Sequence, residues 1–234
     1  MSKEKEAIVE RLGIVAQHNL KGTNQSIVEA EGEILITESG VGPVATAYML
    51  GLITAQFEIT QVILLGVGGA LDSDLGLGDL VLVTGVIQHD AMFWGNKETH
   101  LMKAGELYLT HPNKDSIEIQ FASDKNLNND LTAFLKEKGC EVKVGIILSG
   151  SSFCGTHDSK MALKKIEPRA IMVDMESISV AYAATMQKIP FTVLKGVVDR
   201  MHESTVSEDE YISSIDSVCK KAALVGQFFK QRVN

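Results

Sequence analysis

The chain has 234 residues, of which 45% are hydrophobic and 22% are charged, and its formal net charge is −8. This length and composition predict one globular domain with a well-buried core. The negative charge disfavours a surface for nucleic acid or anionic membranes, and no apolar run approaches the roughly 20 residues of a membrane span.

The cysteines and the N-terminal segment point to a cellular compartment. The three cysteines, Cys140, Cys154 and Cys219, are odd in number and scattered, which favours free thiols over a disulfide framework or a zinc site. The segment MSKEKEAIVERL is charged and amphipathic and lacks the apolar core of a secretory signal. We therefore expect a cytoplasmic protein.

The first part of the chain predicts a helix, a hairpin and a second helix. Residues 2–12 have an apolar helical face, and no strand precedes them. Residues 26–29 and 33–38 are expected to form a β-hairpin. Glycine followed by proline at Gly42-Pro43 then predicts a strand-to-helix junction that opens a helix over 44–55.

A glycine-rich segment, 66–79, separates two apolar strands expected at 62–65 and 80–86. Its glycines let the backbone turn sharply and approach a ligand closely. Turn formation alone is an equally good interpretation. The segment has neither the dinucleotide fingerprint GxGxxG nor the GK[ST] of a phosphate-binding P-loop.

Residues 88–115 are expected to form a long irregular segment, which is typical of functional or mobile loops. A metal site made from His89, Asp90 and His100 is one interpretation. No HExxH-type spacing supports it, so surface histidines are favoured.

The second half of the chain alternates helices with strands. Helices are expected at 124–138, 158–166, 177–187 and 207–229, and strands at 142–148, 170–173 and 191–197. This alternation predicts a single α/β domain over residues 1–234, with three α/β/α layers and a central mixed sheet.

Two carboxylates mark the strand–helix–strand unit between Val173 and Asp199. Glu176 follows the first strand and Asp199 ends the second. Crossover units of this kind place functional groups at the carboxyl ends of their strands. The two acids therefore predict a site at that edge of the sheet.

Several segments together resemble the methylthioadenosine/S-adenosylhomocysteine nucleosidases of the purine nucleoside phosphorylase and nucleosidase superfamily. The resemblance extends from Gly40 to Val233 and rests on SGVGPVATA, VILLGVGGALDSDLGLGDLVLV, SGSSF, VDMES and IPFTVLKGVVD. It implies a nucleoside phosphorylase-like fold and a small-molecule nucleoside bound at the sheet edge, with no metal and no cofactor. It also implies a homodimer.

On the base side, the resemblance implies that Phe153 stacks on adenine and that the Cys154 backbone hydrogen-bonds the edge of the base. Asp199 would protonate a purine ring nitrogen, because the departing base must gain a proton. At the N-terminus, the family has a Met-x-x-Glu helix start whose glutamate activates water, and Glu6 is the match obtained by counting back from the helix.

On the ribose side, the resemblance implies that Met175 packs under the sugar and that Gly69 lines the same cleft. Glu176 would accept hydrogen bonds from the ribose hydroxyls and stabilise the positive charge that develops on the sugar. Lys195 occupies the position of a family arginine. A lysine keeps the charge but lacks the planar guanidinium, which can bind an oxygen ligand through two hydrogen bonds.

Each candidate also has a structural interpretation. Asp174 or Glu176 could serve only the N-terminus of the next helix, and Asp199 could be a loop carboxylate paired with Arg200. Phe153 could belong to the core, and Glu6 could lie on a solvated helix face.

The chain departs from the family pattern at four places. It lacks a strand before the first helix, it has Val67 where serine is usual, and it has Lys195 in place of arginine. Glu208 replaces a phenylalanine of the methylthio pocket, which leaves the 5′ substituent of the substrate open.

These observations leave three functions in order of preference. The first is hydrolysis of an adenine nucleoside, and the second is another superfamily activity, either phosphorolysis or a futalosine hydrolase-like reaction. The chain has four arginines and no matching N-terminal arginine motif, which disfavours a phosphate site. The third is a catalytically silent nucleoside-binding protein.

Overall fold

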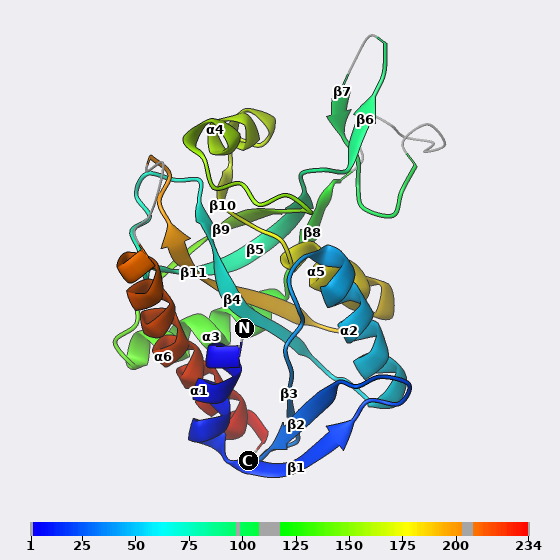
Figure 1. Ribbon diagram of the computed structural model, residues 1–234, viewed down its shortest axis with the longest axis vertical. Helices are drawn as coiled ribbons and strands as arrows, with labels where there is room; N and C mark the ends of the chain where they lie inside the picture. Colours follow the sequence, from blue (N-terminus) through cyan, green and yellow to red (C-terminus); the bar gives the residue numbers. More distant parts are fainter. Residues whose placement is uncertain (1, 97–98, 108–117, 203–207, 234) are drawn as a thin grey trace.

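The computed structural model describes residues 2–96, 99–107, 118–202 and 208–233 (Figure 1). Strands follow one another in the first half of the chain, and from residue 120 onward helices and strands alternate. In these four ranges, none of the helices combines the length and apolar character needed to cross a membrane.

A six-stranded mixed sheet forms the centre of the molecule. Its strands are β4 (Val62–Ala70), β5 (Leu80–Gln88), β8 (Gln120–Ala122), β9 (Val142–Ser149), β10 (Ala170–Asp174) and β11 (Phe191–Asp199). The order is β11-β4-β10-β9-β5-β8, and β11 also pairs with β5, so that the sheet closes on itself. Parallel pairing joins β11 to β4 and β9 to its two neighbours, whereas the remaining pairs are antiparallel. The predicted central mixed sheet is confirmed.

Helices cover both faces of this sheet, as Figure 1 shows. On one face lie α2 (Pro43–Gln56) and α5 (Ser177–Gln187), and on the other lie α3 (Lys125–Glu137) and α6 (Glu208–Val233). The first helix, α1 (Ser2–Leu12), packs on α6. The short α4 (His157–Ile166) stands apart at the end of the sheet that holds the candidate site. Two apolar clusters, one on each face, make the main core.

A small antiparallel sheet precedes the central one along the chain. It consists of β1 (Ile14–Asn19), β2 (Ser26–Ala30) and β3 (Ile34–Ile36). The hairpin of β2 and β3 confirms the prediction, and its turn is made by Gly32 and Glu33, both with positive φ. The sequence did not predict β1, because its apolar residues are exposed and its last three residues are polar.

The glycine-rich segment differs from its prediction, because β4 continues through it to Ala70. A Cβ at Gly68 would come 2.7 Å from the Val173 carbonyl oxygen, and one at Gly66 would come 2.9 Å from the Lys195 ammonium nitrogen. These two glycines therefore allow close packing on neighbouring groups inside a strand, so turn formation alone does not explain them.

Some boundaries and faces also differ from the predictions. The segment 88–115 contains a hairpin of β6 (Met92–Trp94) and β7 (Thr99–Leu101), while its residues 97–98 and 108–115 lie outside the described ranges. The helix expected at 158–166 begins at His157, and its N-cap is Thr156, which forms a capping box with Ser159. The expected start of the last helix, residue 207, lies outside the described ranges.

A cavity of about 350 Å³ lies between β3 and β4. Its wall is mostly aliphatic and comes from both strands, from α1, α2 and α6, and from the segment before β4. Of the strands that the structure describes, β11 pairs with β4 along its length on one side, whereas β10 pairs with only Gly69 and Ala70 on the other. Thr46 lines the cavity, and its buried hydroxyl has no hydrogen-bond partner among the described residues. The edge of β4 that faces β3 therefore lies against a cavity and, over most of its length, is not paired with another described strand.

Candidate active site

Except for Glu6, the predicted site residues gather near the ends of four strands of the central sheet. Gly69, near the end of β4, pairs with Asp199 at the end of β11 and with Val173 in β10. The loop that carries Phe153 follows β9, which pairs with β10. Glu176 lies just beyond β10. The closed sheet thus brings together residues from distant parts of the sequence.

Glu176 is held by two groups that fix both of its carboxylate oxygens. The backbone N–H of Gly42 donates to Oε1 at 3.0 Å, and the Lys195 ammonium donates to Oε2 at 3.2 Å. Gly42 has a φ of 88°, which favours glycine, and a Cβ there would stand 3.9 Å from the end of Met175. Sequence reasoning did not single out Gly42 as a site residue, although the Gly-Pro junction was visible.

Lys195 is buried between two carboxylates. Its ammonium nitrogen lies 2.8 Å from Asp174 Oδ2 and 3.2 Å from Glu176 Oε2, and its side chain is only 2% exposed. Burial acts to lower the pKa of Lys195, but the charges of Asp174 and Glu176 outweigh it, and the net effect raises this pKa. The lysine therefore stays charged and keeps Glu176 oriented toward the strand ends.

Asp174 and Glu176 divide the two roles that the sequence left open. Asp174 accepts hydrogen bonds from the backbone N–H and the hydroxyl of Ser177, so it is Asp174 that supports the start of α5. Glu176 occupies the N-cap position but makes no side-chain capping bond. Its carboxylate is available for another purpose.

Asp199 is paired with Lys160 and not with Arg200, the alternative partner suggested by the sequence. Lys160 Nζ lies 2.7 Å from Asp199 Oδ2 and donates to the Arg200 carbonyl at 2.6 Å. The Arg200 guanidinium instead lies 3.9 Å from Glu210. Sequence reasoning missed Lys160, because a lysine in a short polar helix normally faces solvent.

The loop after β9 presents Phe153 to solvent. Its side chain is 82% exposed, which excludes the core interpretation, and a Cβ at Gly155 would come 2.6 Å from its ring. Cys154 is half-buried, and burial raises the pKa of its thiol.

Asp90 anchors this loop to the end of β5. Its carboxylate accepts hydrogen bonds from the backbone N–H of Ser151 at 2.7 Å and from the Gln88 side chain at 2.8 Å. Burial acts to raise the pKa of Asp90, but these hydrogen bonds outweigh it and lower the pKa overall. Asp90 is therefore a structural support of the loop that carries Phe153.

His89 corrects the preference for surface histidines, because it is buried beneath Gly150 and burial lowers its pKa. Its backbone N–H donates to the Ser149 carbonyl, which fixes it at the end of β9. In the part of the chain that the structure describes, no cluster of three His, Cys, Asp or Glu side chains could hold a metal ion.

Glu6 is the candidate that the structure leaves apart. Its side chain is exposed on α1. The next residue, Ala7, packs near Val67 and Val198, so the start of α1 lies close to the ends of β4 and β11. No described contact joins Glu6 to the other candidates. The side chain of Glu208 lies outside the described residues.

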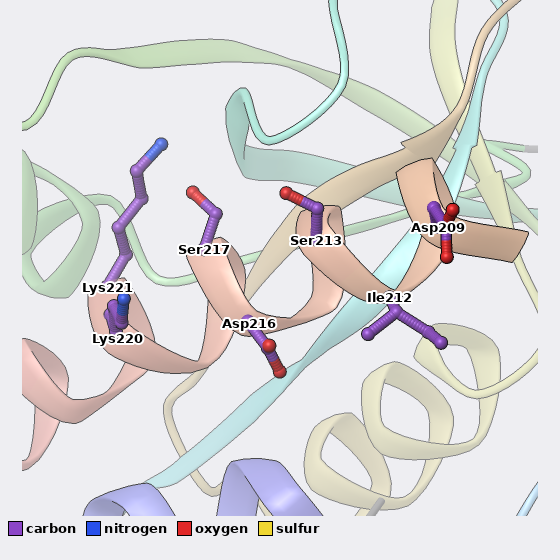
Figure 2. Close-up of a pocket in the computed structure, with 7 residues that line it drawn as sticks. All are labelled: Asp209, Ile212, Ser213, Asp216, Ser217, Lys220 and Lys221. Carbon is purple, nitrogen blue, oxygen red and sulfur yellow. The ribbon is translucent and has the colours of Figure 1, made fainter.

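A second pocket, of about 580 Å³, follows one face of α6 (Figure 2). Its side chains are mainly polar and charged, and Lys221 also donates to the Gly78 carbonyl at 2.6 Å. It contains none of the predicted site residues. Ile212, which lines this pocket, is 41% exposed, although its apolar side chain and helical spacing from Ile215 and Cys219 would suggest a buried position.

Comparison with known proteins gives a consistent assignment. The model of the phosphorylase superfamily matches residues 3–229. A 5′-methylthioadenosine/S-adenosylhomocysteine nucleosidase from Staphylococcus aureus is 30% identical over 198 residues, which cover 83% of this chain and 82% of the relative. The corresponding nucleosidase of Staphylococcus haemolyticus is 29% identical, with 77% and 75% of the two chains covered.

Solved structures show the same fold at lower identity. The 5′-methylthioadenosine/S-adenosylhomocysteine nucleosidase of Campylobacter jejuni has a TM-score of 0.83 and 24% identity, covering 99% of this chain and 96% of that one. The futalosine hydrolase of Helicobacter pylori has a TM-score of 0.80 and 21% identity, covering 99% and 94%. With the match over residues 3–229 and the 30% identity to a nucleosidase, the chain belongs to the phosphorylase superfamily and, within it, to the family of 5′-methylthioadenosine/S-adenosylhomocysteine nucleosidases.

Proposed function

We propose that the protein hydrolyses the N-glycosidic bond of an adenine nucleoside of the methylthioadenosine or S-adenosylhomocysteine type and releases the free base. The observation that carries the proposal is the pair of carboxylates at the strand ends, Glu176 and Asp199, each held by a buried lysine. Breaking this bond requires a negative group at the sugar and a proton for the base.

Glu176 acts on the ribose. Gly42 and Lys195 fix its carboxylate, which accepts hydrogen bonds from the sugar hydroxyls and stabilises the charge that builds up as the bond breaks. Because these partners hold the carboxylate before the substrate arrives, little reorganisation is needed in the transition state. Met175 packs beneath the sugar, and Gly69 leaves room for it.

Asp199 acts on the base. Lys160 occupies Oδ2, which leaves the other oxygen of a half-buried carboxylate to face the purine. The exposed ring of Phe153 is free to stack on the base, and the Cys154 backbone hydrogen-bonds its edge. Both residues lie on the loop that Asp90 anchors.

Activation of the attacking water is assigned to Glu6. If Glu6 removes the proton from water, Glu6→Gln should lower kcat for adenine release by about 10²- to 10⁴-fold, the usual range for a general base. Glu10→Gln, one helical turn later and also exposed, is the matched control and should leave kcat unchanged. Glu4→Gln belongs in the same series, because Met1 and Glu4 have the Met-x-x-Glu spacing, whereas the residue three positions before Glu6 is Lys3. Loss of activity in Glu4→Gln with an active Glu6→Gln would move the role to Glu4.

The reaction itself is tested by incubating the purified protein with methylthioadenosine, S-adenosylhomocysteine, adenosine, inosine and futalosine, with and without phosphate. Release of adenine without phosphate is the expected result. A strict phosphate requirement would make the protein a phosphorylase, and release of base from futalosine alone would make it a futalosine hydrolase. Nucleoside binding without turnover would make it a silent binding protein.

The proposal includes a homodimer. Val41, Val44 and Tyr48 are exposed apolar side chains at the start of α2, and Trp94 is exposed on the β6–β7 hairpin. Val44 and Tyr48, four residues apart, lie on one face of α2, and Val41 comes just before that helix. Such a patch is typical of a subunit interface. Sedimentation velocity should therefore show twice the 25.4 kDa chain mass.

Val44→Glu should shift this protein toward the monomer, because it places a charge in the patch. Val144→Glu, an exposed valine on β9, is the control and should stay dimeric. A wild-type monomer at micromolar concentration would remove the dimer from the proposal.

A cytoplasmic location, supported by the three free cysteines, is open to test by cell fractionation.

A further inference from the structure

Lys160 is an unusual residue for the surface of a short helix. It lies in the second turn of α4, yet its side chain is 0% exposed, and it is one of the two largest fully buried side chains of the described chain, beside Lys195. Its ammonium nitrogen contacts Asp199 Oδ2 at 2.7 Å and the Arg200 carbonyl at 2.6 Å. Burying an ammonium is unfavourable unless it is paired. The fold thus places a lysine directly behind the proposed proton donor.

This arrangement imposes a condition on Asp199. To protonate the base, the carboxyl must have a proton to pass on when the bond breaks. The pair as a whole holds a transferable proton, because the ammonium can donate along its contact with Oδ2. The lysine side of the pair is sealed from solvent, so the proton is exchanged with Asp199.

We propose that Lys160 is the positioning residue of Asp199 and supplies the proton that Asp199 passes to the base, an inference that rests on the proposed function. As the bond between C1′ and the purine breaks, its electron pair moves onto the purine. The Lys160 ammonium gives a proton to Asp199 and becomes a neutral amine, and Asp199 passes a proton to a ring nitrogen of the purine. Water adds to C1′ and gives its proton to the general base. After the products leave, the general base releases that proton to solvent, and Lys160 regains one through Asp199.

The Cys154 thiol is another titratable group near Lys160 that could compete for the proton. The Cys154 thiol precedes α4 and is close enough for its charge state to be affected by Lys160. Burial nevertheless raises the pKa of this thiol, so it remains protonated and takes no proton from the lysine. Proton transfer from Lys160 is therefore directed to Asp199.

The test compares two leaving groups in Lys160→Met and Lys160→Gln. Glutamine keeps an N–H that can orient the carboxylate but has no proton to give, and methionine removes both functions. In both variants, kcat for adenine release from methylthioadenosine should fall by about 10²-fold, with KM changed by less than about threefold. Cleavage of 4-nitrophenyl riboside should change by less than about threefold, because its nitrophenolate leaves without gaining a proton.

Lys164→Met is the matched control. Lys164 lies one turn further along α4, and its ammonium also donates to backbone carbonyls, those of Pro168 and Ala170. Lys164→Met should leave both adenine release and cleavage of 4-nitrophenyl riboside unchanged. Full activity of Lys160→Gln, or an equal loss with both leaving groups, would overturn the proton-supplying role. A wild-type protein that releases no adenine would overturn the proposed function itself, which separates the two failures.

Discussion

Asp199→Asn should slow adenine release by about 10²- to 10⁴-fold, because the amide cannot protonate the departing base. The expected loss is in kcat, since Phe153, Glu176 and the rest of the site can still bind the nucleoside. Single-turnover measurement of adenine release with saturating methylthioadenosine would check it. An unchanged rate would remove Asp199 from the role of acid.

The same substitution should also destabilise the fold, which separates it from a purely catalytic change. Asparagine keeps an oxygen for Lys160 but removes the negative charge that compensates a fully buried ammonium. Leaving one member of a buried ion pair costs about 3 kcal/mol, a cost that the free energy of unfolding in urea would register.

A second variant shows whether this stability loss comes from the pair. Asp199→Asn combined with Lys160→Met removes both charges, so it should recover most of the lost stability while remaining inactive. Asp130→Asn breaks an exposed pair with Arg232 and should change the free energy of unfolding by less than about 1 kcal/mol. If the double variant were no more stable than Asp199→Asn, the loss of stability would not come from an uncompensated charge on Lys160.

Lys195→Met should produce the largest stability loss among single substitutions in the site. It leaves Asp174, whose side chain is 1% exposed, and Glu176 close together without a cation. A loss of about 3–5 kcal/mol is expected, which corresponds to a fall in Tm of roughly 10 °C for a chain of this size. Calorimetry or thermal circular dichroism would measure it.

The pH dependence of this loss follows from the raised pKa of Lys195. A raised lysine pKa contributes stability that is fully present below the ordinary lysine value of about 10.4 and is lost as pH rises through the higher folded-state value. The deficit of Lys195→Met should therefore be constant from about pH 6 to 9 and shrink only in strong alkali. Lys230→Met, which removes an exposed pair with Glu31, should show little deficit at any pH. A deficit that disappears near neutral pH would argue against the charged pair.

The sequence was sufficient for features set by local pattern. The helix α3, the hairpin of β2 and β3, and the unit from Val173 to Asp199 all follow from apolar periodicity and turn residues. The gathering of Glu176 and Asp199 at one edge was also predictable, because strands of a crossover unit end at the same side of a sheet.

Features that depend on distant partners were not predictable. Gly66 and Gly68 belong to a strand because of what lies across from them, Lys195 and Val173, and no local signal reveals such neighbours. Lys160 meets its partner Asp199 only after folding, so its helix alone suggests an exposed side chain. The roles of Asp174 and Glu176 were likewise ambiguous until their partners were known.

Because of the cavity between β3 and β4, we expect the free energy of local unfolding to differ between parts of the molecule. A void next to a strand edge forfeits both packing contacts and ladder hydrogen bonds, so amide hydrogen exchange there should need less energy than in the closed sheet. Lys5 and Ile8 of α1 line this void, so the proposed water-activating carboxylate on α1 is expected to stand beside the region that opens more readily. Glu176 and Asp199 do not line the void, and each is tied to a buried lysine.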